Sequence, residues 1–94
     1  MNIVFTKNAW EDLEYWLEND TKKAIKIKDL IKSIKQDPFK GIGEPEGLKH
    51  GKFKGFWSRR INSEHRLVYR VVGKLGEDQK CEIIMCRFHY DDKK

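Results

Sequence analysis

Apolar residues recur along the chain first at helical spacing and then at strand-like spacing. In residues 10–17 and 24–34 they stand three or four positions apart, which is the spacing of one helix face. The first helix is expected to begin at Asn8, with Glu11 three positions later as in a capping box. The second is expected to cover residues 21–35, so the two predict a helical hairpin.

The remaining apolar stretches are short and rich in β-branched or aromatic residues, which is typical of strands. A first strand is expected at 2–5, and three more at 56–61, 65–72 and 81–90. Between helices and strands, residues 38–47 carry three Gly and two Pro and are expected to form a loop. This order predicts an α+β fold, with two N-terminal helices on one face of an antiparallel sheet of about four or five strands. The other face is expected to be open to solvent.

The length of 94 residues predicts one domain, expected over 1–90 with a charged tail at 91–94. Apolar residues make up 38% and charged residues 37%, a balance that argues against both a disordered chain and a membrane protein. The first residues show no basic region followed by a long apolar stretch, so a cytoplasmic location is expected. Cys81 and Cys86 stand five apart in a predicted strand and are expected to be reduced thiols on opposite faces.

The positive charge is concentrated in one part of the chain. The net charge is +5. Residues 44–71 hold seven Lys and Arg against three Glu, whereas residues 1–43 hold eight basic against seven acidic side chains and residues 72–94 hold five of each. A localised positive patch attracts polyanions such as RNA, although a solvated basic face without any partner is an equal alternative on charge alone.

Strand geometry sorts the charged residues of the predicted sheet into faces. Successive strand side chains point to opposite sides, so Arg66 shares a face with Val68, and His65 shares the other face with Leu67. By the same alternation along the last predicted strand, His89 can meet Arg66 on the open face. The pattern permits this meeting without requiring it.

These residue types suit the cleavage of RNA without a metal ion. That reaction needs a base for the ribose 2′-hydroxyl, cations for the charge on the phosphorane, and an acid for the leaving 5′-oxygen. Either Glu46 or His50 can be the base, and His89 the acid. Further candidates for holding the substrate are basic or aromatic, namely Arg66, Arg60, Arg59, Lys49, Tyr90, Trp57 and Phe56.

Structural roles are the alternative for each of these residues. A Glu on a Gly- and Pro-rich loop is usually solvated, and Arg59, Arg60 and Arg66 can pair with acidic groups such as Glu64 or Glu82. No metal site is expected, because the chain lacks both a C-x-x-C and an H-x-x-x-H pattern. No cofactor is expected either, since no phosphate-binding Gly loop is present.

Several linked motifs resemble the YoeB-type toxins of the RelE superfamily. They are, in order, W-x-D-x-x-Y-W, P-E-G-L-K-H, G-F-W-S-R-R-I, E-H-R-L-V-Y-R-V and C-R-F-H-Y. The resemblance covers residues 2–90, and the chain departs from it in a long charged loop at 73–80 and in the tail at 91–94. It implies a microbial-RNase-like fold and a toxin that cuts mRNA in the A site of the 70S ribosome. It also implies a cognate antitoxin, repression of operator DNA by the toxin–antitoxin pair, and a possible homodimer.

The resemblance carries residue roles by motif position. Glu46 of P-E-G-L-K-H matches the general base, and Arg66 of E-H-R-L-V-Y matches the transition-state clamp. His89 matches the general acid, and Tyr90 matches a residue that holds the substrate nucleotide. Supporting basic positions are matched by Lys49, His50 and Arg60.

Two other functions stay open from the sequence. A toxin of the ParE type would inhibit gyrase without cutting RNA, and its toxicity would survive His89→Gln. A basic RNA-binding module would bind in a salt-sensitive manner and release no product.

Overall fold

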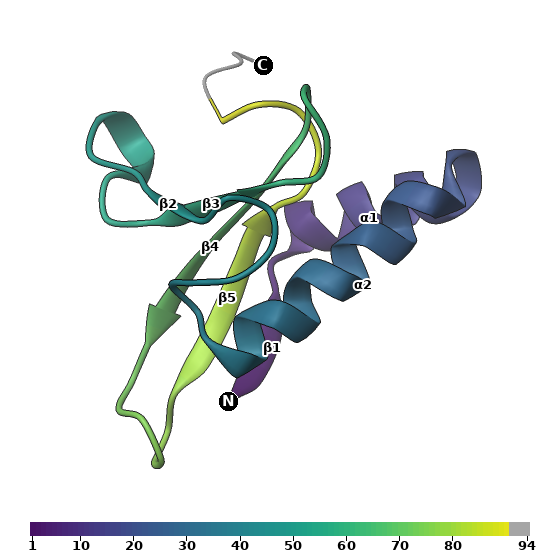
Figure 1. Ribbon diagram of the computed structural model, residues 1–94. Helices are drawn as coiled ribbons and strands as arrows, with labels where there is room; N and C mark the ends of the chain where they lie inside the picture. Colours follow the sequence, from purple (N-terminus) through teal and green to yellow (C-terminus); the bar gives the residue numbers. More distant parts are fainter. Residues whose placement is uncertain (91–94) are drawn as a thin grey trace.

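The computed structural model describes residues 1–90, so the predicted tail at 91–94 lies outside the described residues. Two helices pack on one face of a five-stranded sheet (Figure 1). The helices are α1 (Lys7–Asn19) and α2 (Thr21–Gln36). The strands are β1 (Asn2–Phe5), β2 (Glu46–Gly47), β3 (Trp57–Arg60), β4 (Arg66–Val72) and β5 (Lys80–Met85), and a short 3-10 helix η1 covers Gly51–Phe53. The predicted α+β fold is confirmed.

The sheet is mixed rather than wholly antiparallel. Its order is β1-β5-β4-β3-β2, and the pairs from β5 to β2 are antiparallel as expected. β1 instead lies parallel to β5, with Ile3 opposite Cys81 and Phe5 opposite Ile83. The first and last strands therefore adjoin, a long-range pairing that the periodicity of either strand cannot reveal.

Helix α1 begins two residues earlier than predicted. Its N-cap is Thr6, whose hydroxyl accepts a hydrogen bond from the Ala9 amide at 3.1 Å. The same hydroxyl donates to the Ile84 carbonyl at 3.2 Å, and the Thr6 amide donates to the Ile83 carbonyl at 3.0 Å. Thr6 thus caps the helix and also attaches its start to β5, which explains why Thr6 is preferred to Asn8.

The main core lies between the helices and the sheet. We call this side of the sheet the helix face and the opposite side the site face. The fully buried side chains of the helix face include Ile27, Leu30 and Ile34 from α2 and Leu67 and Tyr69 from β4. This agrees with the alternation predicted for β4, in which Leu67 and Tyr69 point away from Arg66.

The site face is partly covered, contrary to the expectation of an open face. A second small cluster is formed by Leu48, Val68 and Met85. Partly buried side chains packed against it are Phe53, Phe56, Ile84, Phe88 and Tyr90. Ile84 belongs to β5, whereas the others come from the β2–β3 connection and from the segment after β5, which fold over the sheet.

β5 ends at Met85, five residues before the predicted end. The register of β4 and β5 shifts between Val68 and Tyr69, so Val68 pairs with Met85 while Tyr69 pairs with Ile83. This bulge breaks the alternation of faces. Cys86 consequently lies in the same core cluster as Cys81, and the prediction of opposite faces was wrong.

Both thiols are free and buried. Burial raises the pKa of Cys81 to about 12 and also raises the pKa of Cys86. They are therefore poor nucleophiles, as the sequence indicated. Neither α1 nor α2, the helices of the described residues, has the length and apolar character needed to cross a bilayer.

Candidate active site

Glu46 stands on a strand rather than on a loop. The short edge strand β2 pairs Glu46 with Ser58 of β3, so both side chains belong to the same face. The preceding turn is held by a hydrogen bond from the Arg60 amide to the Gly43 carbonyl at 2.7 Å. Pairing with β3 therefore places the Glu46 carboxylate at the sheet edge, where it is solvent-exposed.

Arg60 and Arg66 face each other across the turn that joins β3 to β4. Arg66 is only 8% exposed, and its Nη1 donates to the carbonyls of Asn62 and His65 at 2.9 and 3.2 Å. These bonds hold the guanidinium at a defined position. Arg60 is exposed, and its Nε lies 3.5 Å from a carboxylate oxygen of Glu44.

His89 and Tyr90 reach the site by a route that strand alternation did not predict. The chain leaves β5 at Met85, and Phe88 then adopts a positive φ of 70°. The Phe88 carbonyl accepts a hydrogen bond from the Arg66 amide at 3.0 Å, which brings the segment back to the start of β4. The rings of His89 and Tyr90 then stack loosely, with centroids 4.2 Å apart.

The predicted catalytic side chains gather around one depression of about 450 Å³. We call it the Glu46–His89 depression. Its lining residues are Glu44, Pro45, Glu46, Ser58, Arg60, Arg66, His89 and Tyr90. A carboxylate, two guanidiniums and an imidazole thus share one concave surface, which is the arrangement that acid–base attack on a phosphodiester requires.

Two further hollows lie next to this depression. Lys49 and His50 line an adjoining hollow of about 560 Å³ together with Glu46 and Tyr90. A third hollow of about 240 Å³ lies beside His89 and includes Lys52 from η1. Tyr90 borders all three hollows, so a nucleotide chain crossing them would pass its ring.

Trp57 and Arg59 do not join the site, and their predicted contact with substrate is not supported. Both point to the helix face, because they alternate with Ser58 along β3. The Trp57 ring packs at 4.8 Å from Phe39. Arg59 is 0% exposed, and its guanidinium donates to Tyr69 Oη, to Ser33 Oγ and to three backbone carbonyls.

Ser58 was not among the predicted site residues, yet it lines the Glu46–His89 depression. It is 3% exposed and lies between Glu46 and Arg60 on the same face. Its alternation with Trp57 and Arg59 in W-S-R-R was the signal that could have identified it. Glu44 also lines the depression and was not predicted. Its position depends on the turn before β2, in which its own backbone is left-handed with φ of 52°.

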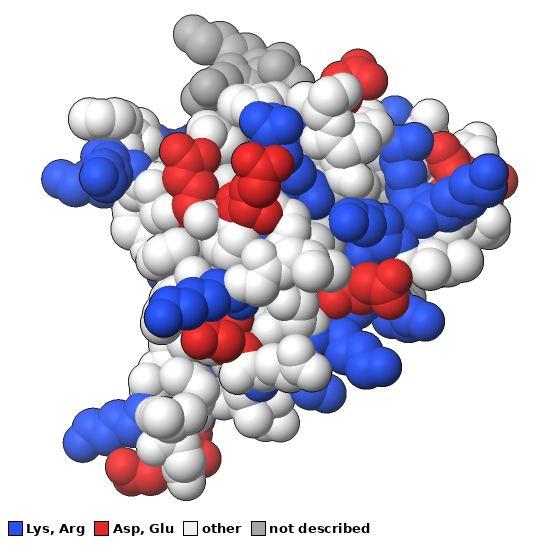
Figure 2. All heavy atoms as spheres, viewed as in Figure 1, with Lys and Arg blue, Asp and Glu red and all other residues white. Residues whose placement is uncertain are grey.

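Charge is spread over the molecule more widely than the segment totals suggested. Acidic and basic side chains interleave at the end where β2 and β3 lie in Figure 1, and basic side chains also extend over the helices at the right (Figure 2). The helix α2 alone holds six Lys, at 22, 23, 26, 28, 32 and 35. An RNA partner would therefore meet positive charge beyond the depression itself.

A separate groove lies between the two helices and β1, with a volume of about 410 Å³. Its lining residues are mostly aliphatic, and they include Leu13, Leu17, Ile25 and Ile31. A groove of this composition has few groups for acid–base chemistry, so the Glu46–His89 depression is the candidate active site. Within residues 1–90, no three His, Cys, Asp or Glu side chains form a group suited to a metal ion.

The chain is similar to known toxins over almost all of its length. A family described as the YoeB-like toxin of bacterial type II toxin–antitoxin systems matches residues 5–90. The toxin YoeB of Synechocystis sp. is 51% identical over 90 residues, which cover 96% of this chain and 98% of the relative. A solved structure of a YoeB/ParE toxin from Agrobacterium tumefaciens is 49% identical with a TM-score of 0.88, covering 96% of this chain and all of the other.

Two solved structures from Staphylococcus aureus show assemblies. A YoeB dimer is 45% identical with a TM-score of 0.82, and a YoeB–YefM complex is 43% identical with a TM-score of 0.80. Each comparison covers 96% of this chain and 98% of the other.

Proposed function

Because the chain belongs to the YoeB-like toxins of bacterial type II toxin–antitoxin systems, we propose that it is a ribosome-dependent endoribonuclease that cleaves mRNA in the ribosomal A site. The observation that supports this proposal is the convergence of Glu46, Arg66, His89 and Tyr90 on one depression. These residues come from β2, from β4 and from the segment after β5, so the fold alone brings them together.

The reaction is an internal transfer of the phosphoryl group. Glu46 removes the proton of a ribose 2′-hydroxyl, and the resulting oxygen attacks the adjacent phosphorus. Arg66 and Arg60 stabilise the negative charge of the phosphorane. His89 donates a proton to the leaving 5′-oxygen as the P–O5′ bond breaks. The products are a 2′,3′-cyclic phosphate and a free 5′-hydroxyl, with no metal ion taking part.

The neighbouring residues would hold the nucleotides on either side of the cleaved bond. The Tyr90 ring packs against the small cluster of the site face and offers a surface for stacking on a base. Lys49 and His50 are exposed in the adjoining hollow and are placed to contact phosphate oxygens.

The site is expected to have little cleavage activity in the free protein and to become active on the ribosome. The Glu46 carboxylate is exposed to water in the free protein. Bound mRNA and rRNA would exclude water and add negative charge around it, and both effects make a carboxylate more basic. Rapid, specific cleavage of naked RNA would contradict this part of the proposal.

The partners follow from the same family membership. We propose a cognate antitoxin that covers and inhibits the site, in keeping with the YoeB–YefM complex. We also propose that the toxin–antitoxin pair binds operator DNA, and that a homodimer resembling the Staphylococcus aureus dimer can form. A cytoplasmic location fits a protein that acts on translating ribosomes.

The test is cleavage of a ribosome-bound message, mapped by primer extension with and without ribosomes. Glu46→Ala, Arg66→Ala and His89→Gln are each expected to reduce the cleavage rate by about 10²-fold or more. Glu18→Ala is the matched control, because Glu18 is an exposed carboxylate on α1, outside the depression. A folded wild-type protein that cuts nothing would favour the gyrase-inhibiting or RNA-binding alternatives, which supercoiling and filter-binding assays separate.

A further inference from the structure

Hydrogen bonds from distant parts of the chain hold the backbone of the segment that carries His89. The Cys86 amide donates to Asp12 Oδ2 at 3.0 Å, and the Cys86 carbonyl accepts from Trp16 Nε1 at 2.8 Å. Two residues later, the Phe88 amide donates to His65 Nδ1 at 2.7 Å, and the Phe88 carbonyl accepts from the Arg66 amide at 3.0 Å. Helix α1 therefore holds Cys86, while the start of β4 holds Phe88.

Phe88 is where the chain turns toward the site. Its φ of 70° lies in the left-handed region, which is unfavourable for a residue with a side chain. Such a conformation persists only where neighbouring contacts stabilise it. The His65 side chain makes one of these contacts, through its hydrogen bond with the Phe88 amide.

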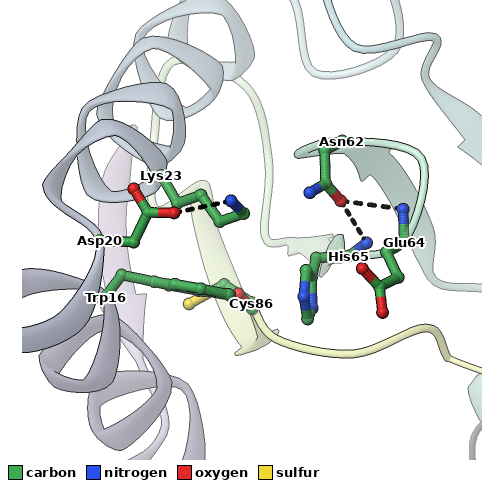
Figure 3. A network of polar contacts seen from close by, with 7 residues as sticks. All are labelled: Trp16, Asp20, Lys23, Asn62, Glu64, His65 and Cys86. Carbon is green, nitrogen blue, oxygen red and sulfur yellow. Dashed lines mark hydrogen bonds and ion pairs between the residues drawn. The ribbon is translucent and has the colours of Figure 1, made fainter.

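The geometry of this bond defines the state of the His65 ring. Nδ1 accepts a hydrogen bond from the Phe88 backbone amide, so this nitrogen carries no proton and the ring proton lies on Nε2. The ring is edge-on to Trp16, with centroids 4.8 Å apart. The His65 backbone amide donates to Asn62 Oδ1 at 2.7 Å, so the backbone that carries the ring is also held (Figure 3).

We propose that His65 is a positioning residue for His89, acting through the backbone of Phe88; this inference rests on the proposed nuclease function. The His65 ring contacts Trp16 on the helix face, whereas the neighbouring Arg66 lines the Glu46–His89 depression on the site face. The interaction requires an acceptor at the position of Nδ1, which an apolar side chain cannot provide.

The expected defect is in the chemical step. A general acid must lie within hydrogen-bond reach of the leaving oxygen, and a displacement of about 1 Å can cost about 10²-fold in rate. His89 donates a proton only as the bond breaks. Loss of its position should therefore lower kcat and leave KM for the ribosome–mRNA complex unchanged.

Two substitutions separate the hydrogen bond from simple packing. His65→Leu fills the space without an acceptor, whereas His65→Asn places an amide oxygen at the same number of bonds from the backbone as Nδ1. We expect His65→Leu to lower kcat by about 10- to 100-fold at unchanged KM, and His65→Asn to stay within about threefold of wild type. Equal kcat for all three proteins, or equal losses in both variants, would overturn the inference.

A second measurement uses the free toxin and needs no ribosome. The amide hydrogen of Phe88 should exchange about tenfold faster in His65→Leu than in wild type or His65→Asn. The ring protons of His89, which stack near Tyr90, should shift in the NMR spectrum of His65→Leu alone. Unchanged exchange and shifts would overturn the inference even if the protein cuts no RNA. If His65→Leu does not fold, His65→Gln, whose acceptor is one bond farther out, takes its place.

Discussion

Arg59 and Arg60 are neighbours in β3, yet their guanidiniums lie on opposite faces of the sheet. Arg59 is 0% exposed on the helix face, whereas Arg60 borders the Glu46–His89 depression and pairs loosely with Glu44. Two adjacent arginines therefore have different roles. One joins the α2–β2 connection to the sheet, and the other is available to a phosphate.

This difference predicts opposite effects of the same substitution. Arg59→Met would leave the carbonyls of Asp37, Lys40 and Ile42 without their donor, so we expect a loss of about 3 kcal/mol in the free energy of unfolding. Arg60→Met should leave that free energy almost unchanged and reduce cleavage. Urea denaturation followed by circular dichroism measures the first effect, and primer extension measures the second. A stable Arg59→Met protein would contradict the structural role.

Gly43 and Gly76 both have left-handed backbones, with φ of 83° and 80°. A Cβ at Gly43 would lie 2.6 Å from Leu30 Cδ2, whereas a Cβ at Gly76 would meet nothing within 4 Å. Gly76→Ala should therefore cost only the backbone strain of about 1 kcal/mol. Gly43→Ala should cost at least twice as much and slow cleavage, because the turn before Glu46 must move. Equal urea midpoints for the two variants would contradict this.

The buried thiols predict a pH dependence of stability. Folding raises the pKa of Cys81 from 9.0 to about 12, so the folded state keeps a proton that the unfolded chain loses. The stabilisation is complete below pH 9.0, and the free energy of unfolding falls as pH rises from there toward about 12. The pKa of Cys86 is also raised by burial, so it adds to the same trend.

Urea titrations at several pH values between about 8 and 10 would measure this slope. The matched control is the double variant Cys81→Ala, Cys86→Ala, in which other groups still titrate. Its free energy of unfolding should fall less steeply with pH than that of wild type. Equal slopes would show that the thiols do not contribute.

Trp16 and Trp10 lie on the same helix in different surroundings. Trp16 is 4% exposed and donates to the Cys86 carbonyl, whereas Trp10 is 48% exposed. Trp16→Phe would leave a buried carbonyl without its donor, which should cost about 1–3 kcal/mol in the free energy of unfolding. Trp10→Phe should change it by less than about 0.5 kcal/mol. Urea midpoints followed by circular dichroism compare the two, and equal midpoints would be the contrary result.

Substitutions of Tyr90 test the proposed stacking of this ring on a base of the mRNA. Tyr90→Phe keeps the ring and should retain most of the cleavage, whereas Tyr90→Ala removes it. The loss of stacking on one base should lower the cleavage rate by about tenfold or more. Phe39→Ala removes an exposed ring on the other face and is the control. Primer extension on ribosomes gives the rates, and equal rates for Tyr90→Ala and Phe39→Ala would argue against stacking.

The periodicity of the sequence predicted the two helices, the three C-terminal strands and the side of Arg66 in β4. These features depend on local spacing, since an apolar face must repeat every 3.6 or every two residues to be buried. The motifs also indicated which side chains belong to the site, and Glu46, Arg66, His89 and Tyr90 do lie around one depression.

Tertiary contacts alone decided the rest. The parallel pairing of β1 with β5 joins residues about 80 positions apart, and the bulge opposite Val68 turns Cys86 back into the core. The same bulge and the left-handed Phe88 place His89 at the site by a route that simple alternation does not describe. The sequence by itself determined which residues can act. Long-range hydrogen bonds decided where they stand, because a one-residue change of register reverses every face that follows it.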